Sequence, residues 1–242
     1  DSIWQAAGRA VLVFIDQEGG RVRRLRPPLW PDFPAPWRYR RLHGQDAALG
    51  IEAAWLGHRL IAAELEPMGV HANCAPVCDL RHPGAHDIVG DRALGETSDV
   101  AVVLAKAALE GLAAGGVCGV IKHMPGHGRA QSDSHAGLPV VRAGPGQLEE
   151  DFAVFRGLAD APMGMPAHIV FSALDAERPA TLSSRLITET IRGHIGFSGL
   201  LMTDDLGMNA LESAAGGGKL AIRARSALAA GCDIVLHCAG FV

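Results

Sequence analysis

The chain lacks an apolar run long enough to cross a membrane, and it lacks an excess of positive charge. Its 242 residues contain 22 lysines and arginines against 26 acidic residues, for a formal net charge of −4. This balance leaves no basic stripe of the kind that binds nucleic acid or an anionic membrane. The first residues show no charged-then-apolar signal pattern. We therefore expect no nucleic-acid or membrane partner and a cytoplasmic location, although a segment preceding Asp1 could carry an export signal.

Cysteines are few and odd in number, and most are embedded in apolar runs. The five are Cys74, Cys78, Cys118, Cys232 and Cys238. Scattered cysteines of this kind indicate buried thiols in a reducing compartment rather than a disulfide framework. The sequence does not indicate an oligomeric state.

Metal-binding motifs are also absent. The side chains that could be drawn as a zinc or two-metal site are His123, His127, Asp133, His135 and His168. They form neither a His-x-His pair nor a His-Glu-x-x-His helix, and the Lys122 ammonium beside His123 would oppose a cation. We predict no metal and no cofactor.

Six short apolar runs alternate with alanine- and leucine-rich segments of helical periodicity. The predicted strands cover residues 11–16, 70–79, 117–123, 163–170, 200–205 and 232–238, and the predicted helices cover 46–66, 100–114, 147–158 and 183–194. This alternation indicates an α/β fold with a parallel sheet. The hydrophobic content of 48% and the length suit a single domain over residues 1–242.

Polar side chains fall at the carboxyl ends of five of these six runs, and they include Asp16, Asp79, His123, His168 and Asp204. Barrel active sites are assembled at that end of the strands. No Gly-x-Gly-x-x-Gly fingerprint follows the first strand, which disfavours a doubly wound sheet. We therefore expect a TIM-type barrel.

Three segments carry candidate catalytic or binding groups, and each has a simpler alternative. Asp133 and His135 follow a loop rich in small residues, where a carboxylate can orient an imidazole for proton transfer; the alternative is a polar turn. Asp204 and Asp205 end an apolar strand, and one of the two is a candidate nucleophile; the alternative is that the aspartate caps the next helix. The acidic and basic residues from Asp16 to Arg24 suit a polar ligand or a salt-bridged surface loop.

In order, the motifs resemble those of family 3 glycoside hydrolases, and above all the bacterial β-N-acetylhexosaminidase (NagZ-like) subgroup. The motifs are Asp-Gln-Glu-Gly-Gly-Arg at 16–21, Ala-Pro-Val-Cys-Asp at 75–79, Gly-Asp-Arg at 90–92, Lys-His-Met-Pro-Gly-His-Gly at 122–128, Asp-Ser-His at 133–135, Met-Pro-Ala-His at 165–168 and Thr-Asp-Asp-Leu at 203–206. They cover nearly the whole chain, and seven motifs in the right order are far more specific than any one of them.

The resemblance implies a role for each matching residue. Asp204 corresponds to a nucleophile that forms a covalent glycosyl-enzyme, His135 to the acid/base and Asp133 to its dyad partner. The positions that match sugar-binding residues are Asp16, Arg24, Arg92, Lys122, His123 and, less directly, His168. The implied reaction is retaining hydrolysis of terminal β-linked N-acetylglucosamine from a small glycan such as a muropeptide or disaccharide, as in peptidoglycan recycling.

Two expectations depart from the usual pattern of this family: the barrel is shorter, and hydrolysis has two alternatives. Only six strands are visible, so we expect a (β/α)8 barrel that lacks its first strand-helix units and its C-terminal helix. A histidine acid/base would not repel phosphate, which leaves phosphorolysis open as an alternative. An inactive barrel that binds glycans without cleaving them is the third possibility.

Overall fold

A computed structural model describes residues 5, 8, 11–131, 137–212, 214 and 218–238. Six parallel strands form its central sheet, in the order β1-β2-β3-β5-β7-β8. Their bounds are Phe14–Ile15 (β1), Ala72–Asn73 (β2), Cys118–Met124 (β3), Met163–Pro166 (β5), Leu200–Asp205 (β7) and Ile234–Leu236 (β8). Chain order therefore equals spatial order, as expected when each strand is followed by a crossover helix.

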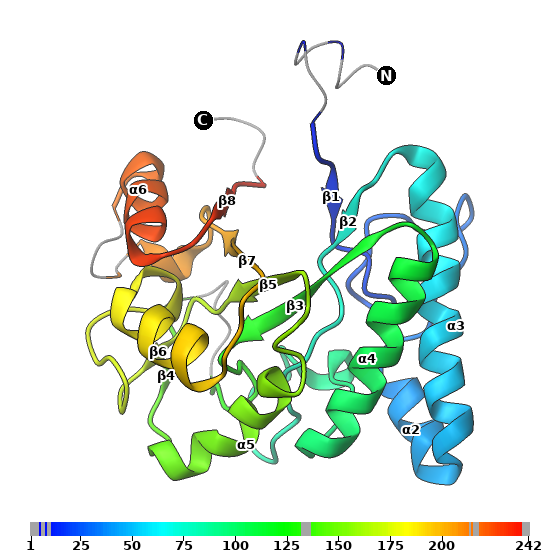
Figure 1. Ribbon diagram of the computed structural model, residues 1–242, viewed down its shortest axis with the longest axis horizontal. Coiled ribbons are helices and arrows are strands. Elements are labelled where there is room, and N and C mark those ends of the chain that lie inside the picture. The colour runs from blue at the N-terminus through cyan, green and yellow to red at the C-terminus, as the bar shows by residue number, and fades with distance from the viewer. Residues whose placement is uncertain are drawn as a thin grey trace.

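Helices surround the sheet on its outer side (Figure 1). The longer ones are α2 (Trp37–Gln45), α3 (Ala47–Leu65), α4 (Ser98–Ala114), α5 (Pro145–Arg156), the π-helix η4 (Leu186–His194) and α6 (Leu220–Ala230). Short 3-10 turns are η1 (Glu66–Met68), η2 (Gly90–Arg92), η3 (Ala180–Leu182) and η5 (Asn209–Leu211). The strands β4 (Val140–Val141) and β6 (Val170–Phe171) form a separate parallel pair. None of the helices in the described ranges is both long and apolar enough to span a membrane.

Apolar side chains form separate layers on the two faces of the sheet. The concave face carries a small, sulfur-rich cluster that contains Cys74, Met163, Met165 and Met202. A larger cluster fills the space between the sheet and the surrounding helices. Both faces of the strands are thus buried, which explains why the strands read as continuous apolar runs rather than as alternating patterns.

The pair formed by α3 and α4 shows how local sequence fixes this outer layer. The Asp46 carboxylate accepts the backbone N–H of Leu49 at 3.1 Å and so caps the start of α3. Further along, a Cβ atom at Gly111 of α4 would lie only 2.2 Å from the carbonyl oxygen of Trp55. Glycine at this position allows the two helices to approach closely.

The six predicted strands and their parallel arrangement are confirmed, but a closed barrel is not. Within the described residues, β1 and β8 are the two ends of a curled sheet (Figure 1), so the observed architecture is a half-barrel. The helices α2 and α6 and the β4–β6 pair were not predicted. The predicted helix over 183–194 is a π-helix that begins at Leu186.

Candidate active site

A polar cavity of about 210 Å³ opens where β1, β3 and β7 end. The side chains that line it are Asp16, Glu18, Arg21, Val22, Arg24, Ile88, Arg92, Lys122, His123, His127 and Asp204. Three of these are carboxylates and four are permanently cationic. The carboxyl ends of parallel strands meet at one edge of the sheet, which is why residues more than a hundred positions apart share this cavity.

An ion-pair network, buried at Glu18, Lys122 and Arg92, lines the cavity. Lys122 Nζ lies 2.8 Å from a Glu18 oxygen and 3.0 Å from an Asp16 oxygen. Arg92 donates two parallel hydrogen bonds to the Glu18 carboxylate, at 2.8 and 2.9 Å. Arg24 donates to the second Asp16 oxygen at 3.0 Å from a more exposed position. The network fixes each charged head in a defined orientation before any ligand arrives.

The network keeps its members ionised in spite of burial. Burial alone would raise the pKa of Glu18, but Lys122 and Arg92 lower it to about 2. Burial opposes the charge of Lys122, whereas Glu18 and Asp16 raise its pKa above the usual range. Each partner therefore stabilises the other's charge in a region with little water.

Asp79 organises the two histidines that follow β3. Its Oδ2 accepts a hydrogen bond from His123 Nδ1 at 2.7 Å, and its Oδ1 accepts the backbone N–H groups of His123 and His127 at 3.2 and 2.6 Å. Burial would raise the Asp79 pKa, but these two histidines lower it to about 2. The His127 ring lies edge-on to His123, and burial lowers its pKa to about 4. The Asp79 carboxylate thus holds His123 with Nε2 directed into the cavity.

Asp204 projects from the end of β7 toward this imidazole. Its Oδ2 lies 4.0 Å from His123 Nε2, and its Oδ1 accepts the backbone N–H of Asp205 at 2.8 Å. Burial would raise the Asp204 pKa, but His168, His123 and Lys122 lower it to about 2. The side chain is 23% exposed, so an ionised carboxylate is available to a molecule in the cavity.

Comparisons with known proteins agree with this arrangement. A model of the glycosyl hydrolase family 3 N-terminal domain matches residues 4–242. This chain belongs to glycosyl hydrolase family 3. A β-hexosaminidase of Bordetella avium is 37% identical over 239 residues, which cover 98% of this chain and 67% of that protein.

Solved structures of family 3 proteins show the same fold. NagZ from Neisseria gonorrhoeae in complex with N-trifluoroacetyl-D-glucosamine is 36% identical, with a TM-score of 0.85, and the match covers 94% of this chain and 65% of that one. A family 3 β-N-acetylglucosaminidase from Paenibacillus is 32% identical with the same TM-score, over 98% of this chain and 44% of that one. The chain spans about two thirds of the length of the β-hexosaminidases and NagZ proteins that it matches.

The structure brings most of the predicted site residues of this family 3 chain together. Six of them line the one cavity, namely Asp16, Arg24, Arg92, Lys122, His123 and Asp204. The predicted acid/base dyad, Asp133 and His135, lies outside the described residues. Among the groups of His, Cys, Asp and Glu in the described ranges, none is arranged to hold a metal ion.

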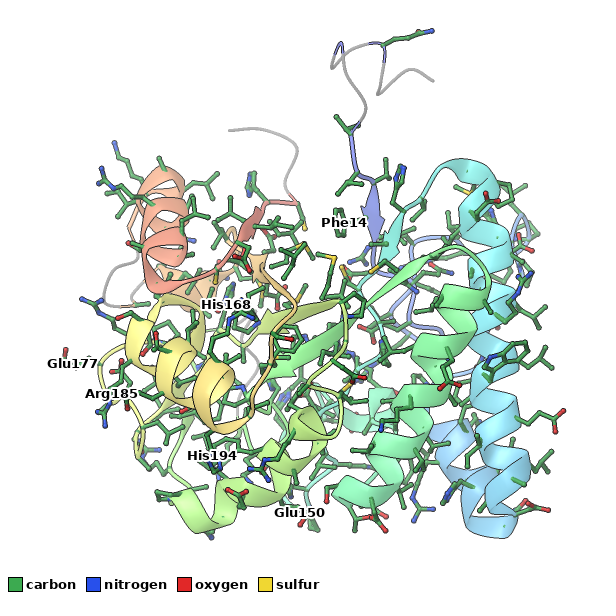
Figure 2. All side chains as sticks on the ribbon, viewed as in Figure 1. Phe14, Glu150, His168, Glu177, Arg185 and His194 are labelled. Carbon is green, nitrogen blue, oxygen red and sulfur yellow. The ribbon has the colours of Figure 1, made fainter. Side chains whose placement is uncertain are left out.

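His168 lies inside the domain and not on the cavity wall (Figure 2). Its ring nitrogens contact the Thr181 hydroxyl at 2.7 Å and the Asp205 carbonyl oxygen at 3.0 Å. Burial lowers the His168 pKa. In this position His168 supports the backbone immediately after Asp204.

Sequence reasoning assigned no role in the site to three residues that build it. Glu18 and Asp79 are the buried counter-ions described above, and Arg21 donates to the carbonyl oxygens of Asp87 and Ile88 at 2.6 and 2.8 Å. Each of the three lies in a motif that was singled out from the sequence. The available signal was the presence of charged residues within or beside apolar runs, where a charge requires a partner.

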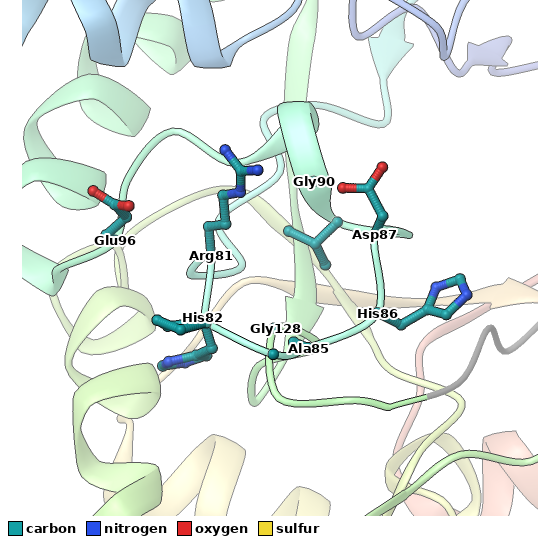
Figure 3. Close-up of a pocket in the computed structure, with 11 residues that line it drawn as sticks. Arg81, His82, Ala85, His86, Asp87, Gly90, Glu96 and Gly128 are labelled. Atoms are coloured by element: carbon teal, nitrogen blue, oxygen red, sulfur yellow. The ribbon is translucent and has the colours of Figure 1, made fainter.

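A second cavity, of about 200 Å³, lies on the other side of the 87–90 segment. Figure 3 shows Arg81 and His82 on one side of it and His86 and Asp87 on the other, with Gly128 between them. Gly128 belongs to the connection that follows β3. The connections after β2 and β3 therefore pack directly against each other.

Proposed function

We propose that this family 3 chain is a retaining β-N-acetylglucosaminidase that removes terminal β-linked N-acetylglucosamine from small glycans such as peptidoglycan fragments. In this proposal residues 1–242 form one catalytic domain. The observation that carries the proposal is the ionised Asp204 carboxylate, which is held at the cavity next to His123 and Lys122. The names of the matched relatives support the choice of substrate.

The cavity suits a neutral sugar because its own charges already pair with one another. Lys122 uses two of its three N–H groups on Asp16 and Glu18, and the third can be donated to a sugar hydroxyl. Arg24 and Asp16 can supply further donors and acceptors at the rim. A ligand that carries hydroxyl groups gains oriented hydrogen bonds here and adds no net charge to a buried network.

In the proposed reaction Asp204 attacks the anomeric carbon while the leaving oxygen receives a proton from His135. A covalent glycosyl-enzyme forms, and the aglycone departs as an alcohol. Neutral His135 then takes a proton from water, which attacks the same carbon and releases Asp204. Asp133 would stabilise the imidazolium. Two displacements at one carbon retain its configuration.

The test is turnover of nitrophenyl β-N-acetylglucosaminide by the purified chain, with the β-glucoside as comparison. We expect selective release of nitrophenol that is lost in Asp204→Asn and reduced in His135→Ala. The absence of turnover by the folded parent chain would reject the proposal in favour of a binding-only domain. Formation of a glycosyl phosphate in phosphate buffer would reject hydrolysis in favour of phosphorolysis.

A further inference from the structure

Asp151 is a buried carboxylate on α5, outside the sugar cavity. Its side chain is 2% exposed, and its two oxygens contact different segments of the chain. Oδ2 accepts a hydrogen bond from Arg129 Nε at 2.5 Å, and Oδ1 lies 2.9 Å from His82 Nε2. The carboxylate therefore joins the connection after β3 to the connection after β2.

The chain from Gly126 to Gln131, here called the stem, is fitted closely to this carboxylate. Gly126 has a φ of +139°, and a Cβ atom there would lie 2.8 Å from the Cβ of Asp151. The backbone carbonyl of Ala130 accepts the N–H of His86 at 3.0 Å. The stem is thus held from the α5 side by Asp151 and from the side of the second cavity by the 81–90 segment (Figure 3).

The chain is also anchored a few residues further on. Val140 and Val141 of β4 pair with Val170 and Phe171 of β6, and Pro139 accepts the N–H of Val170 at 3.0 Å. Asp133 and His135 lie in sequence between these two anchors, four and six residues after Arg129. The two anchors, the stem and β4, therefore flank the dyad in the sequence.

We propose that Asp151 is a positioning residue for the acid/base, acting through Arg129 and the stem. This inference rests on the proposed function, in which His135 protonates the leaving group. A misplaced acid costs rate only where proton donation is needed, because proximity and orientation decide the efficiency of proton transfer. Weakening this anchor should therefore impair protonation while leaving nucleophilic attack by Asp204 intact.

The experiment compares kcat/KM for a phenyl and a dinitrophenyl β-N-acetylglucosaminide in the parent chain and in Asp151→Asn. Dinitrophenolate departs without a proton, whereas phenol requires one. We expect a loss of roughly ten- to a hundredfold on the phenyl substrate and less than about twofold on the dinitrophenyl substrate. Equal losses on both substrates, or no loss on either, would overturn the proposal.

The same helix offers a matched control. Glu149 also contacts one arginine and one histidine, Arg156 at 2.6 Å and His194 at 2.9 Å, but it does so at the surface and away from the stem. Glu149→Gln should retain parental kcat/KM on both substrates. A leaving-group-dependent loss in this control as large as that in Asp151→Asn would show that the effect is not specific to Asp151.

A second variant keeps the proposal testable if Asp151→Asn does not fold. Arg129 is 22% exposed, so Arg129→Gln removes the contact to the stem without creating a buried unpaired carboxylate, since His82 still contacts Asp151. It should show the same selective loss on the phenyl substrate. Uniform losses in this folded variant would refute the inference.

Hydrogen exchange provides a readout that does not depend on activity. Amides of residues 126–131 should exchange faster in Asp151→Asn and Arg129→Gln than in the parent or in Glu149→Gln. Unchanged exchange in the stem would contradict the anchoring role even if activity fell. A parent chain that cleaves neither substrate would instead reject the proposed function.

Discussion

Replacement of Glu18 by glutamine should destabilise the fold strongly, because it removes a negative charge that Arg92 needs. Among the ion pairs of the described residues, Glu18 is the only carboxylate that Arg92 contacts. Glu18 is 1% exposed and receives hydrogen bonds from Arg92 while Lys122 lies 2.8 Å away. Glutamine keeps one acceptor oxygen but leaves two buried cations with less compensation. Breaking a buried pair by removing one partner typically costs about 3–5 kcal/mol.

The pKa of Glu18 gives a second route to this magnitude. A pKa lowered from 4.5 to about 2 corresponds to about 3 kcal/mol of preference for the ionised carboxylate in the folded chain. Because the folded pKa is the lower one, this stabilisation is complete above about pH 4.5 and is lost as the pH falls toward about 2. The stability difference between parent and Glu18→Gln should therefore shrink below about pH 4.5.

Urea unfolding at several pH values measures this difference directly. Near neutral pH we expect a loss of about 3–5 kcal/mol, with a fall in Tm of roughly 10 °C. Glu189→Gln is the control, since Glu189 pairs with Arg185 at 3.2 Å with both side chains exposed, and it should change stability by less than about 0.5 kcal/mol. A loss below about 1 kcal/mol in Glu18→Gln, or a loss independent of pH, would refute the reasoning.

Other expected outcomes concern the cavity, the pH profile and helix packing. Asp79→Asn leaves one acceptor oxygen where two now hold the His123 ring and the backbone N–H groups of His123 and His127, so kcat/KM for an aryl N-acetylglucosaminide should fall at least roughly tenfold; parental kcat/KM would contradict this. The nucleophile, with a pKa of about 2, stays ionised in the working range, so the alkaline limb of kcat/KM should report loss of the His135 proton and should vanish in His135→Ala. Gly111→Ala places a methyl group 2.2 Å from a backbone oxygen and should lower the free energy of unfolding by about 1–3 kcal/mol, whereas Gly146→Ala meets no atom within 4 Å and should be neutral or slightly stabilising.

Much of the sheet could be predicted because its strands are buried on both faces and alternate with helices. Continuous apolar runs then mark each strand, and the polar residues that follow mark the edge where the site lies. This reasoning correctly placed Asp16, His123 and Asp204 at one end of the sheet. The remaining secondary structure gave weaker signals. The helix α2 buries only Tyr39, so it shows no clear apolar period.

Partnerships between distant residues could not be predicted from local patterns. Glu18 meets Arg92 across 74 positions, and Asp79 meets His123 across 44. The sequence placed Asp79 and His123 at strand ends, but it did not indicate which charges would pair. His168 illustrates the converse, since the family resemblance implied a position facing the sugar, whereas the ring is buried against Thr181 and Asp205.

The most direct test of the central claim is to trap the glycosyl-enzyme on Asp204. His135→Ala should form it readily from dinitrophenyl β-N-acetylglucosaminide, whose leaving group needs no acid, and should hydrolyse it slowly because the base is missing. Intact-mass and peptide mass spectrometry of this variant should show one N-acetylglucosaminyl group on the peptide that contains Asp204, and no adduct in the Asp204→Asn, His135→Ala double variant. Turnover without an adduct, or an adduct at another residue, would contradict Asp204 as the nucleophile.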